Sequence, residues 1–380
     1  MQEFSISGQL WTEEGFRAGR LTISDGKIQG CEYGEGLKAD YSFPDSYVCP
    51  GLIDMQINGG LGFDFTQQPN SVGEVAKALP RWGVTAFLPT YITAPIETYF
   101  EALGWLKANA ATTKGAIPLG AHIEGPFLNP RYKGAHEETF LRHPSLEETH
   151  RLWECAGDCL KLMTLAPELV GALEVANWLH EKGIIVSAGH TAATYEEGLV
   201  AFESGIRLVT HLFNAMPSLH HRKPGIVGVS LAAKDTFCGI IVDGIHLHPG
   251  IVRLVYRLKG AANILLVTDA MAGMGMPPGK YVLGGQEVIV TDKTARLANF
   301  AGTLAGSILT LNQAIANMIV YTDCSVAEAV GMASLNPARL LGIDKRKGRL
   351  EAGYDADIAV FKPDNFETLM TLVNGEILYN

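Results

Sequence analysis

The feature that most constrains the fold is a series of eight short apolar segments of β-like composition. They lie at residues 48–58, 84–89, 117–124, 160–166, 184–190, 208–214, 238–243 and 264–269. Most are separated by segments in which apolar residues recur with the helical period, most clearly at 96–110, 169–181 and 195–202. Eight buried strands joined by crossovers favour an α/β fold with a closed (β/α)8 TIM-type barrel over an open sheet.

Both ends of the chain differ from this middle part. Short β-like pieces with turn signals between them lie at 4–9, 19–24, 27–31, 348–350, 357–361 and 371–378. We therefore predict a small β-sandwich domain formed by residues 1–50 and 345–380, with the barrel at residues 51–344. Residues 272–303 interrupt the alternation, and we expect a Gly/Pro-rich, partly β-like insertion over the site. Helices are expected again at 307–321 and 326–334.

Charge and cysteine content narrow the class of function. The formal net charge of -10 argues against a surface that binds nucleic acid, but it does not exclude an anionic small substrate. The six cysteines form no Cys-x-x-Cys motif, and no apolar run approaches the roughly 18 residues of a membrane span. Residues 1–20 carry acids and no apolar signal segment. We expect a cytoplasmic protein without membrane or nucleic-acid partners.

Residues that can bind metal or transfer protons stand at the ends of several predicted strands. Catalytic groups of such barrels come from the C-terminal ends of strands, where Glu124, His190 and His211 are found. Taken alone, Glu124 could cap a turn and each histidine could be a hydrogen-bonded core residue. Together, two histidines and one carboxylate match the protein ligands of a catalytic zinc site with an open position for water.

Asp269 closes the eighth predicted strand. A buried aspartate without a partner is costly, and a water activated by the metal is the partner that this geometry offers. We therefore predict that Asp269 is the general base that takes a proton from this water and later passes it to the leaving amine. Arg222, followed by Lys223-Pro-Gly, fits an anion contact and an ordinary exposed arginine equally well.

Six short motifs overlap predicted strands of the chain. They are Pro50-Gly-Leu-Ile-Asp54, His122-Ile-Glu-Gly-Pro126, Ser187-Ala-Gly-His190, Thr210-His-Leu-Phe-Asn-Ala-Met-Pro217, Asp243-Gly-Ile-His246 and Val267-Thr-Asp-Ala270. Together they resemble the motifs of the N-acetylglucosamine-6-phosphate deacetylases, which belong to the amidohydrolase superfamily. The match runs from about residue 18 to the C-terminus, and the run at 210–217 is its most specific part. The tail at 348–357 is shared across the superfamily.

The resemblance implies a role for each matching position and hydrolysis of the acetamide of N-acetylglucosamine 6-phosphate to glucosamine 6-phosphate and acetate. Glu124, His190 and His211 correspond to metal ligands, and Asp269 to the catalytic acid/base. His136 matches a histidine that polarises the acetyl carbonyl. Arg222 matches an arginine that reaches the phosphate from the neighbouring subunit, which implies a homodimer. Further substrate contacts are implied at Ala135, Asn214, Ala215, His246, Leu304, Ala305 and Gly306.

One departure from the superfamily bears on the metal content. Many amidohydrolases carry His-x-His at the end of the first strand, where this chain reads Gln56-Ile-Asn58. Amide oxygens are weak zinc ligands, so we predict one divalent metal ion per site, which could be zinc, iron, cobalt or manganese. The alternatives are an amidohydrolase acting on another amide or a cyclic imide, and a barrel that serves as a non-catalytic scaffold.

Overall fold

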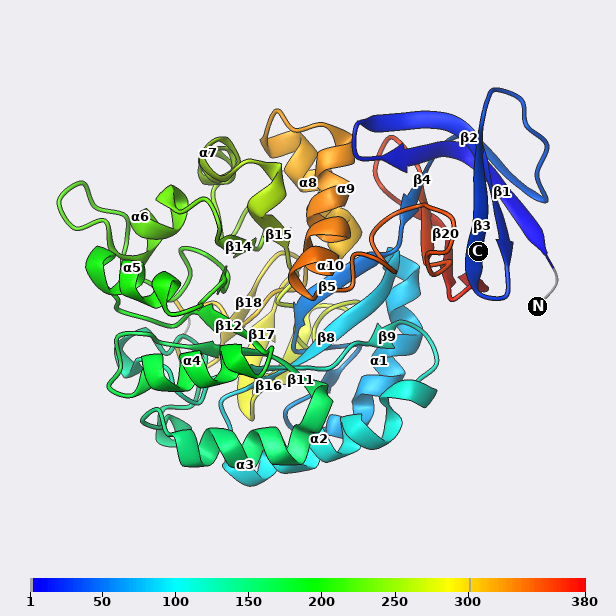
Figure 1. Cartoon of the computed structure of the whole chain (residues 1–380). Coiled ribbons are helices and arrows are strands. Elements are labelled where there is room, and N and C mark those ends of the chain that lie inside the picture. Colours follow the sequence, from blue (N-terminus) through cyan, green and yellow to red (C-terminus); the bar gives the residue numbers. More distant parts are fainter. Residues whose placement is uncertain (1–2, 301) are drawn as a thin grey trace.

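The computed structural model describes residues 3–300 and 302–380; residues 1–2 and 301, at the start of the predicted β domain and inside the predicted insertion, lie outside them. Eight parallel strands follow one another around a barrel (Figure 1). A parallel bridge between Ile57 and Ala270 joins the first strand to the end of the last and closes it. The strands are β5 (Leu52–Ile57), β8 (Val84–Ile92), β10 (Ala121–Glu124), β11 (Leu160–Leu165), β12 (Ile185–Ala188), β13 (Leu208–Val209), β14 (Phe237–Ile240) and β15 (Ile264–Leu266).

The burial of the barrel strands explains their apolar sequence. All nine residues of β8 are buried, so most of them are apolar and they do not alternate regularly with polar residues. This burial makes the eight segments recognisable, and each predicted segment overlaps a barrel strand. The segment at 84–89 covers only the first part of β8, and the segment at 238–243 begins one residue after the start of β14. Residues 117–124 also contain the short strand β9 (Ile117–Pro118), which pairs with β8. The prediction of a (β/α)8 barrel is therefore confirmed.

Helices cover the outside of the barrel (Figure 1). The helix expected at 169–181 begins three residues late, after Gly171, whose φ of 87° is outside the helical range. The starts of α5 and α9 are held by capping boxes, in which Thr194 pairs with Glu197 and Ser325 with Glu328. The helices are α1 (Val72–Ala78), α2 (Ile96–Asn109), α3 (Leu146–Ala156), α4 (Ala172–Glu181), α5 (Tyr195–Glu203), α6 (Gly225–Ala232), α7 (Pro249–Lys259), α8 (Leu311–Tyr321), α9 (Val326–Ala333) and α10 (Leu335–Leu340).

Strands from both ends of the chain pair in one sheet beside the barrel, which fits the predicted small β-sandwich domain. Only β1 and β4 pair in parallel; the other neighbours are antiparallel. The sheet order is β21 (Glu376–Tyr379), β20 (Thr368–Val373), β19 (Ile358–Phe361), β4 (Tyr41–Pro50), β1 (Phe4–Thr12), β2 (Gly15–Ser24) and β3 (Lys27–Tyr33).

The domain boundaries at residues 50/51 and 344/345 stay a prediction. Two details of the strands in this sheet differ from the prediction. The strand expected at 348–350 is wrong: Gly348 has a φ of 87°, and Arg349 forms ion pairs with Glu13 instead of joining a sheet. Strand β4 was only partly recognised, because its first half is mostly exposed and contains Pro44.

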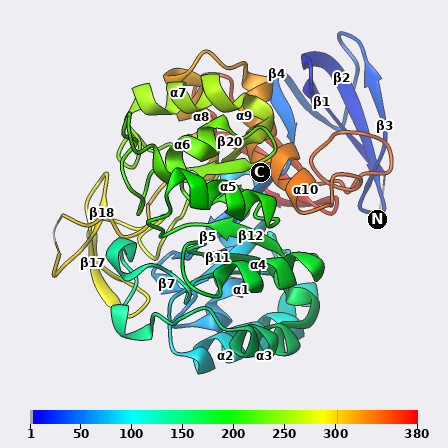
Figure 2. The ribbon, with the colours of Figure 1, turned by 60° about the vertical axis from the view of Figure 1, so that its left-hand side comes forward.

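The insertion after the eighth strand is a small antiparallel sheet, as its partly β-like sequence predicted. It consists of β16 (Gly279–Leu283), β17 (Gln286–Val290) and β18 (Ala295–Leu297), and it lies on the side of the barrel away from the terminal sheet (Figure 2). The backbone N–H of Gly284 donates to Asp64, the last residue of the short strand β7 (Phe63–Asp64), which pairs with β6 (Gly59–Gly60). The side chain of Gln286 donates to the carbonyl of Ala135. These two bonds join the insertion to loops at the C-terminal end of the barrel.

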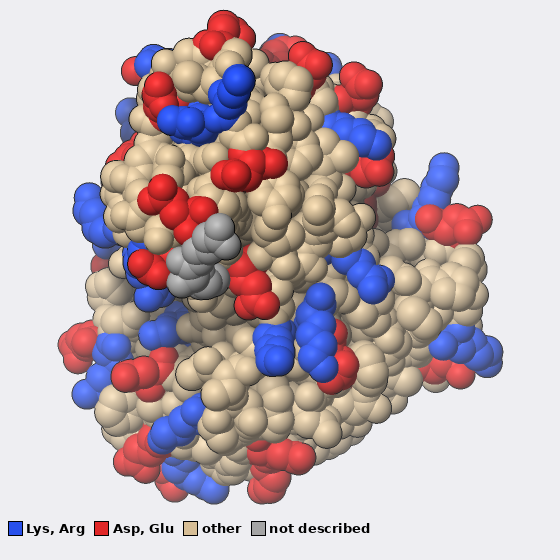
Figure 3. Space-filling model, turned by 90° about the vertical axis from the view of Figure 1, so that its right-hand side faces the viewer, with Lys and Arg blue, Asp and Glu red and all other residues tan. Residues whose placement is uncertain are grey.

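The surface gives no sign of a large basic patch on the face that Figure 3 shows. Lysine and arginine side chains are interspersed there with aspartate and glutamate. Within residues 3–300 and 302–380, no helix is long and apolar enough to cross a membrane.

A buried ion-pair cluster lies within the C-terminal segment, between Lys347, Asp355 and Asp357. We expect Lys347→Met to lower the free energy of unfolding by about 3–5 kcal/mol. Lys347 is only 3% exposed; its Nζ lies 3.0 Å from Asp355 and also bonds Asp357. The substitution would leave buried carboxylates without this cation. Urea denaturation at neutral pH measures the change. Lys280→Met, which breaks the exposed pair with Glu287, should cost less than about 1 kcal/mol. Similar losses in both variants would contradict the prediction.

Candidate active site

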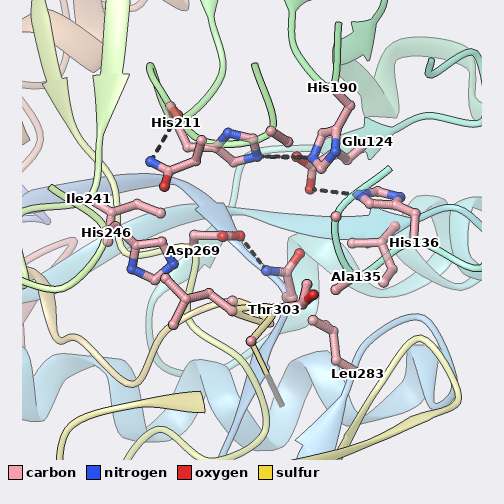
Figure 4. A pocket seen from close by; sticks show the side chains of 18 residues that line it. Glu124, Ala135, His136, His190, His211, Ile241, His246, Asp269, Leu283 and Thr303 are labelled. Carbon is pink, nitrogen blue, oxygen red and sulfur yellow. Dashed lines mark hydrogen bonds and ion pairs between the residues drawn. The ribbon is translucent and has the colours of Figure 1, made fainter. Parts of the chain in front are cut away.

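Most of the predicted site residues meet in one pocket at the C-terminal end of the barrel (Figure 4). Glu124 is the last residue of β10, and His190, His211 and Asp269 follow β12, β13 and β15 within three residues. The pocket has a volume of about 260 Å³, which suits a small molecule. The predicted residues that line it are Glu124, Ala135, His136, His190, His211, Asn214, Ala215, His246, Asp269, Leu304 and Gly306.

The backbone bends sharply where three of these side chains enter the pocket. The φ values of His190, His211 and Asp269 are 48°, 29° and 49°. They lie in the left-handed region, which residues other than glycine rarely adopt. Such a conformation costs about 1–3 kcal/mol per residue and persists only where the surrounding structure enforces it. The strain is concentrated at the strand ends that present functional groups.

Three side-chain atoms converge as a set of metal ligands. Nε2 of His190 lies 3.2 Å and Nε2 of His211 lies 3.0 Å from Oε1 of Glu124, and the two nitrogens are 3.1 Å apart. All three residues are buried. Burial alone would raise the pKa of Glu124, but its contacts with the two histidines outweigh burial and hold the pKa well below its usual value. A negative carboxylate therefore faces two imidazoles.

The hydrogen bonds of His190 select the tautomer that can bind a metal. Its Nδ1 lies 2.9 Å from the backbone carbonyl of Tyr132, which can only accept a hydrogen bond. We therefore assign the proton of the neutral ring to Nδ1. The lone pair of Nε2 then points toward Glu124 and His211, and a carbonyl-bound Nδ1–H is the usual support of a metal-binding histidine.

The donor set fits a divalent cation. Two imidazole nitrogens lie 3.1 Å apart beside one carboxylate oxygen. Burying these electron-rich atoms together is costly unless a positive charge lies among them. Nδ1 of His211 is buried and has no hydrogen-bond partner among the described residues, so none of them orients this ring by a hydrogen bond at Nδ1. Three protein ligands leave a coordination position open, as in catalytic zinc sites.

Asp269 is held beside this cluster by two amide groups. Its Oδ1 accepts hydrogen bonds from Nε2 of Gln56 at 3.2 Å and from Nδ2 of Asn58 at 2.7 Å. Gln56 also donates to Oε1 of Glu124 at 3.1 Å and so bridges the two carboxylates. Burial and the negative charge of Glu124 raise the pKa of Asp269 to about 6. A carboxyl group with such a pKa can both accept and return a proton near neutral pH.

His136 presents an N–H group to the same space. The backbone N–H of Thr93 donates to its Nδ1 at 3.2 Å, so we assign the proton of the neutral ring to Nε2. That nitrogen lies 4.0 Å from Oε2 of Glu124. Burial lowers the pKa of His136 well below its usual value, and electrostatic repulsion from the nearby His190 lowers it further. The ring is therefore neutral. A fixed, neutral N–H donor beside the metal ligands can polarise a carbonyl oxygen.

The opposite part of the pocket contains groups suited to a polar ligand. Nδ1 of His246 lies 2.7 Å from Oδ2 of Asp243, which orients the ring and leaves Nε2 for a ligand. Asn214 donates to the carbonyl of His211 at 3.2 Å, and Ala215 adopts a left-handed φ of 52°. The loop after β13 is therefore tightly folded beside the three candidate metal ligands.

Two predicted contacts do not line this pocket within a single chain. Arg222 is exposed, and its guanidinium bonds the neighbouring His221 at 2.7 Å. Ala305 is fully buried in the small core beneath the insertion. Both assignments therefore stay predictions.

Other residues that line the pocket were missed. Leu283 belongs to the insertion and Ile92 to β8, and neither carries a chemical signal in the sequence. The others are Gly134, Ile241, Gly302 and Thr303. Asn58, which was interpreted only as a replacement for a metal ligand, lines the pocket as well.

A further missed residue, Glu168, lies behind the site. Its carboxylate accepts hydrogen bonds from Asn129 at 2.9 Å, from the Thr191 hydroxyl and from the Ala192 backbone at 2.6 Å. It therefore fixes the loop that follows His190. The only signal of this role in the sequence is the position of Glu168 three residues after the end of the fourth barrel strand, β11.

The chain is similar to known proteins over most of its length. The model of the amidohydrolase family matches residues 47–378. The N-acetylglucosamine-6-phosphate deacetylase of Bos taurus is 40% identical over 87% of this chain and 83% of its own length. That of Bacillus subtilis is 38% identical over 96% and 94%. A mutant of the Mycobacterium smegmatis enzyme, solved with N-acetyl-D-glucosamine-6-phosphate, superposes with a TM-score of 0.95 at 28% identity over the whole of both chains.

The barrel and its Glu/His/His cluster thus define a metal-dependent hydrolase, and the chain belongs to the amidohydrolase family. Within that family it is an enzyme of the N-acetylglucosamine-6-phosphate deacetylase group, as its identity with several members over most of its length shows. Both resemblances inferred from the sequence motifs are confirmed.

Proposed function

We propose that this enzyme hydrolyses the acetamide of N-acetylglucosamine 6-phosphate to glucosamine 6-phosphate and acetate. The observation that carries the proposal is the convergence of the Glu124, His190 and His211 ligand atoms beside both Asp269 and the N–H of His136. Amide hydrolysis needs an activated water, a polarised carbonyl and a group that returns a proton to the amine. The pocket supplies a candidate for each.

The roles of the residues follow from their positions. A divalent cation held by Glu124, His190 and His211, one per site and most simply zinc, lowers the pKa of water and polarises a carbonyl when bound. Asp269 accepts the proton of the attacking water and then donates it to the departing nitrogen. His136 donates its Nε2–H to the carbonyl oxygen, on which negative charge develops.

The phosphosugar would occupy the side of the pocket formed by Asn214, Ala215 and His246, with the loop at 304–306 along the sugar ring. We further propose that the phosphate is bound by the partner subunit's Arg222 in a homodimer, because Arg222 is exposed and does not line the pocket of its own chain. A cytoplasmic location is proposed as well, and the six unpaired cysteines suit a reducing compartment.

The test is acetate release by the purified protein, with metal content determined on the same sample. We expect rapid release from N-acetylglucosamine 6-phosphate, loss of activity with a chelator, and close to one metal ion per chain. N-acetylgalactosamine 6-phosphate, measured in parallel, establishes which sugar is preferred. A folded, metal-replete sample that releases no acetate from either would exclude the proposed substrates, and other amides and cyclic imides would then be screened.

The phosphate assignment predicts a selective effect of Arg222→Ala. Loss of a guanidinium–phosphate contact should raise KM for N-acetylglucosamine 6-phosphate by about 10- to 100-fold and change KM for N-acetylglucosamine itself much less. Lys223→Ala, which removes a neighbouring exposed cation, is the matched control. Equal effects of Arg222→Ala on both substrates would remove Arg222 from the phosphate site. Analytical ultracentrifugation tests the homodimer independently.

A further inference from the structure

The pocket contains a buried hydrogen-bond acceptor that no described residue satisfies. Asn58 is 2% exposed and lines the pocket, and its Oδ1 has no hydrogen-bond partner among the described residues. Its Nδ2 donates to Oδ1 of Asp269 at 2.7 Å, a bond that appears as the dashed line at Asp269 in Figure 4. Because an ionised carboxylate only accepts hydrogen bonds, the NH2 end of this amide must face Asp269. The carbonyl end is therefore turned away from it.

The backbone holds this side chain in place. The N–H of Asn58 donates to the carbonyl of Ala270 at 2.7 Å, and its carbonyl accepts from the N–H of Phe65 at 2.9 Å. With both backbone groups and Nδ2 engaged, the amide plane has little freedom to rotate toward another donor. A buried polar atom without a partner costs about 1–3 kcal/mol. When such an acceptor belongs to a residue that lines a pocket, it indicates that a bound molecule supplies the hydrogen-bond donor.

We propose that Oδ1 of Asn58 accepts a hydrogen bond from the N–H of the amide that the enzyme cleaves. This inference rests on the proposed deacetylase function and adds to it a catalytic residue that recognises the leaving nitrogen. The nitrogen that Asp269 protonates must lie within hydrogen-bond reach of its carboxyl group. Asn58 binds that same carboxyl group through its other end, so its Oδ1 is an unsatisfied acceptor near the place that this nitrogen must occupy.

The hydrogen bond has a consequence for the bond-breaking step. Water adds its oxygen to the carbonyl carbon, and Asp269 accepts the water's proton. The C–N bond then breaks, its electron pair stays on nitrogen, and nitrogen takes that proton from Asp269 to become an amine. A secondary amide nitrogen carries one N–H. When Asn58 holds this N–H, the developing lone pair is free to face Asp269.

The experiment compares an amide with an ester of the same sugar phosphate. The 2-O-acetyl ester of glucose 6-phosphate carries oxygen where N-acetylglucosamine 6-phosphate has N–H, so it cannot donate to Asn58. Asn58→Leu replaces Oδ1 and Nδ2 with methyl groups on a side chain of the same branched shape. Gln56→Met is the matched control, because Gln56 also donates to Oδ1 of Asp269 from the same strand.

We expect Gln56→Met to lower kcat for the amide and the ester by the same factor. Asn58→Leu should lower kcat for the amide by about 10- to 100-fold more than for the ester, as expected for an unsatisfied polar contact. Metal content and circular dichroism of each sample show whether the site and the fold are intact. Asn58→Ala allows the same comparison if the leucine variant does not fold.

Three outcomes would overturn the inference. An equal loss on the amide and the ester in Asn58→Leu would mean that Oδ1 does not contact the scissile N–H. Loss of a bound metal ion in that variant alone would assign Oδ1 to a cation instead. Failure of the unsubstituted enzyme to hydrolyse either compound would exclude the proposed function and this inference with it, whereas the first two outcomes leave the proposed function standing.

Discussion

Replacement of Asp269 by asparagine is expected to lower kcat by about 10²- to 10⁴-fold while the metal content stays unchanged. The reason is chemical: the amide has nearly the same shape as the carboxylate but cannot accept the proton of the attacking water. Because Asp269 is not among the three converging ligands, the cation should stay bound. Acetate release and metal analysis on the same preparation measure both effects.

The pH profile supplies an independent reading of the same residue. Asp269 must be ionised to act as a base, so kcat/KM should fall as the pH drops through its pKa. Burial and the charge of Glu124 raise that pKa to about 6, and a bound cation would lower it again, so the acidic limb should lie at or below pH 6. This limb should be absent in Asp269→Asn. Asp235→Asn, which alters an exposed aspartate outside the pocket, should keep the activity and the profile. Near-normal turnover in Asp269→Asn would exclude the general-base role.

The second large effect is expected on removal of the metal. Dialysis against a chelator should lower activity by more than about 10³-fold, because water activation and carbonyl polarisation are lost together. Activity should return when a divalent cation is added back. His190→Ala should have the same effect as metal removal, because it removes one of the three atoms that would bind the metal.

A matched control is available on the surface. His143 is exposed and lies outside the pocket, so His143→Ala should keep both metal and activity. Titration of zinc, iron, cobalt and manganese into the metal-free enzyme ranks the cations. Full activity in a sample shown to be free of metal would contradict the proposed mechanism and with it the role given to Glu124, His190 and His211.

The sequence was sufficient for the barrel because its signal is local. Strands buried on both faces require continuous apolar runs, and such runs are visible without any knowledge of their neighbours, as in β8. The failures also have local causes. Residues 348–350 resemble a strand in composition, but the left-handed backbone at Gly348 turns the chain out of any sheet. The first half of β4 is exposed and therefore lacks the apolar pattern.

The site could be predicted in part for a similar reason. In a parallel barrel, all strands end on the same side, so Glu124, His190, His211 and Asp269 were expected to meet once the strands were placed. The structure brings them together. Gln56 and Asn58 were interpreted only as weak replacements for metal ligands. Their hydrogen bonds to Asp269 show a different use, as donors that hold the base.

The sequence by itself determined the order of strands, the barrel and the residue types at the strand ends, because these depend on the periodicity of neighbouring residues. Only the tertiary structure decided which loops complete the pocket. Gln286 meets Ala135 across 151 positions of sequence, and Gln56 and Asn58 reach Asp269 across 213 and 211. No local pattern encodes such contacts. Those to Asp269 exist only after barrel closure has brought the first and last strands together, and that of Gln286 exists only after the insertion has folded onto the loop that follows β10.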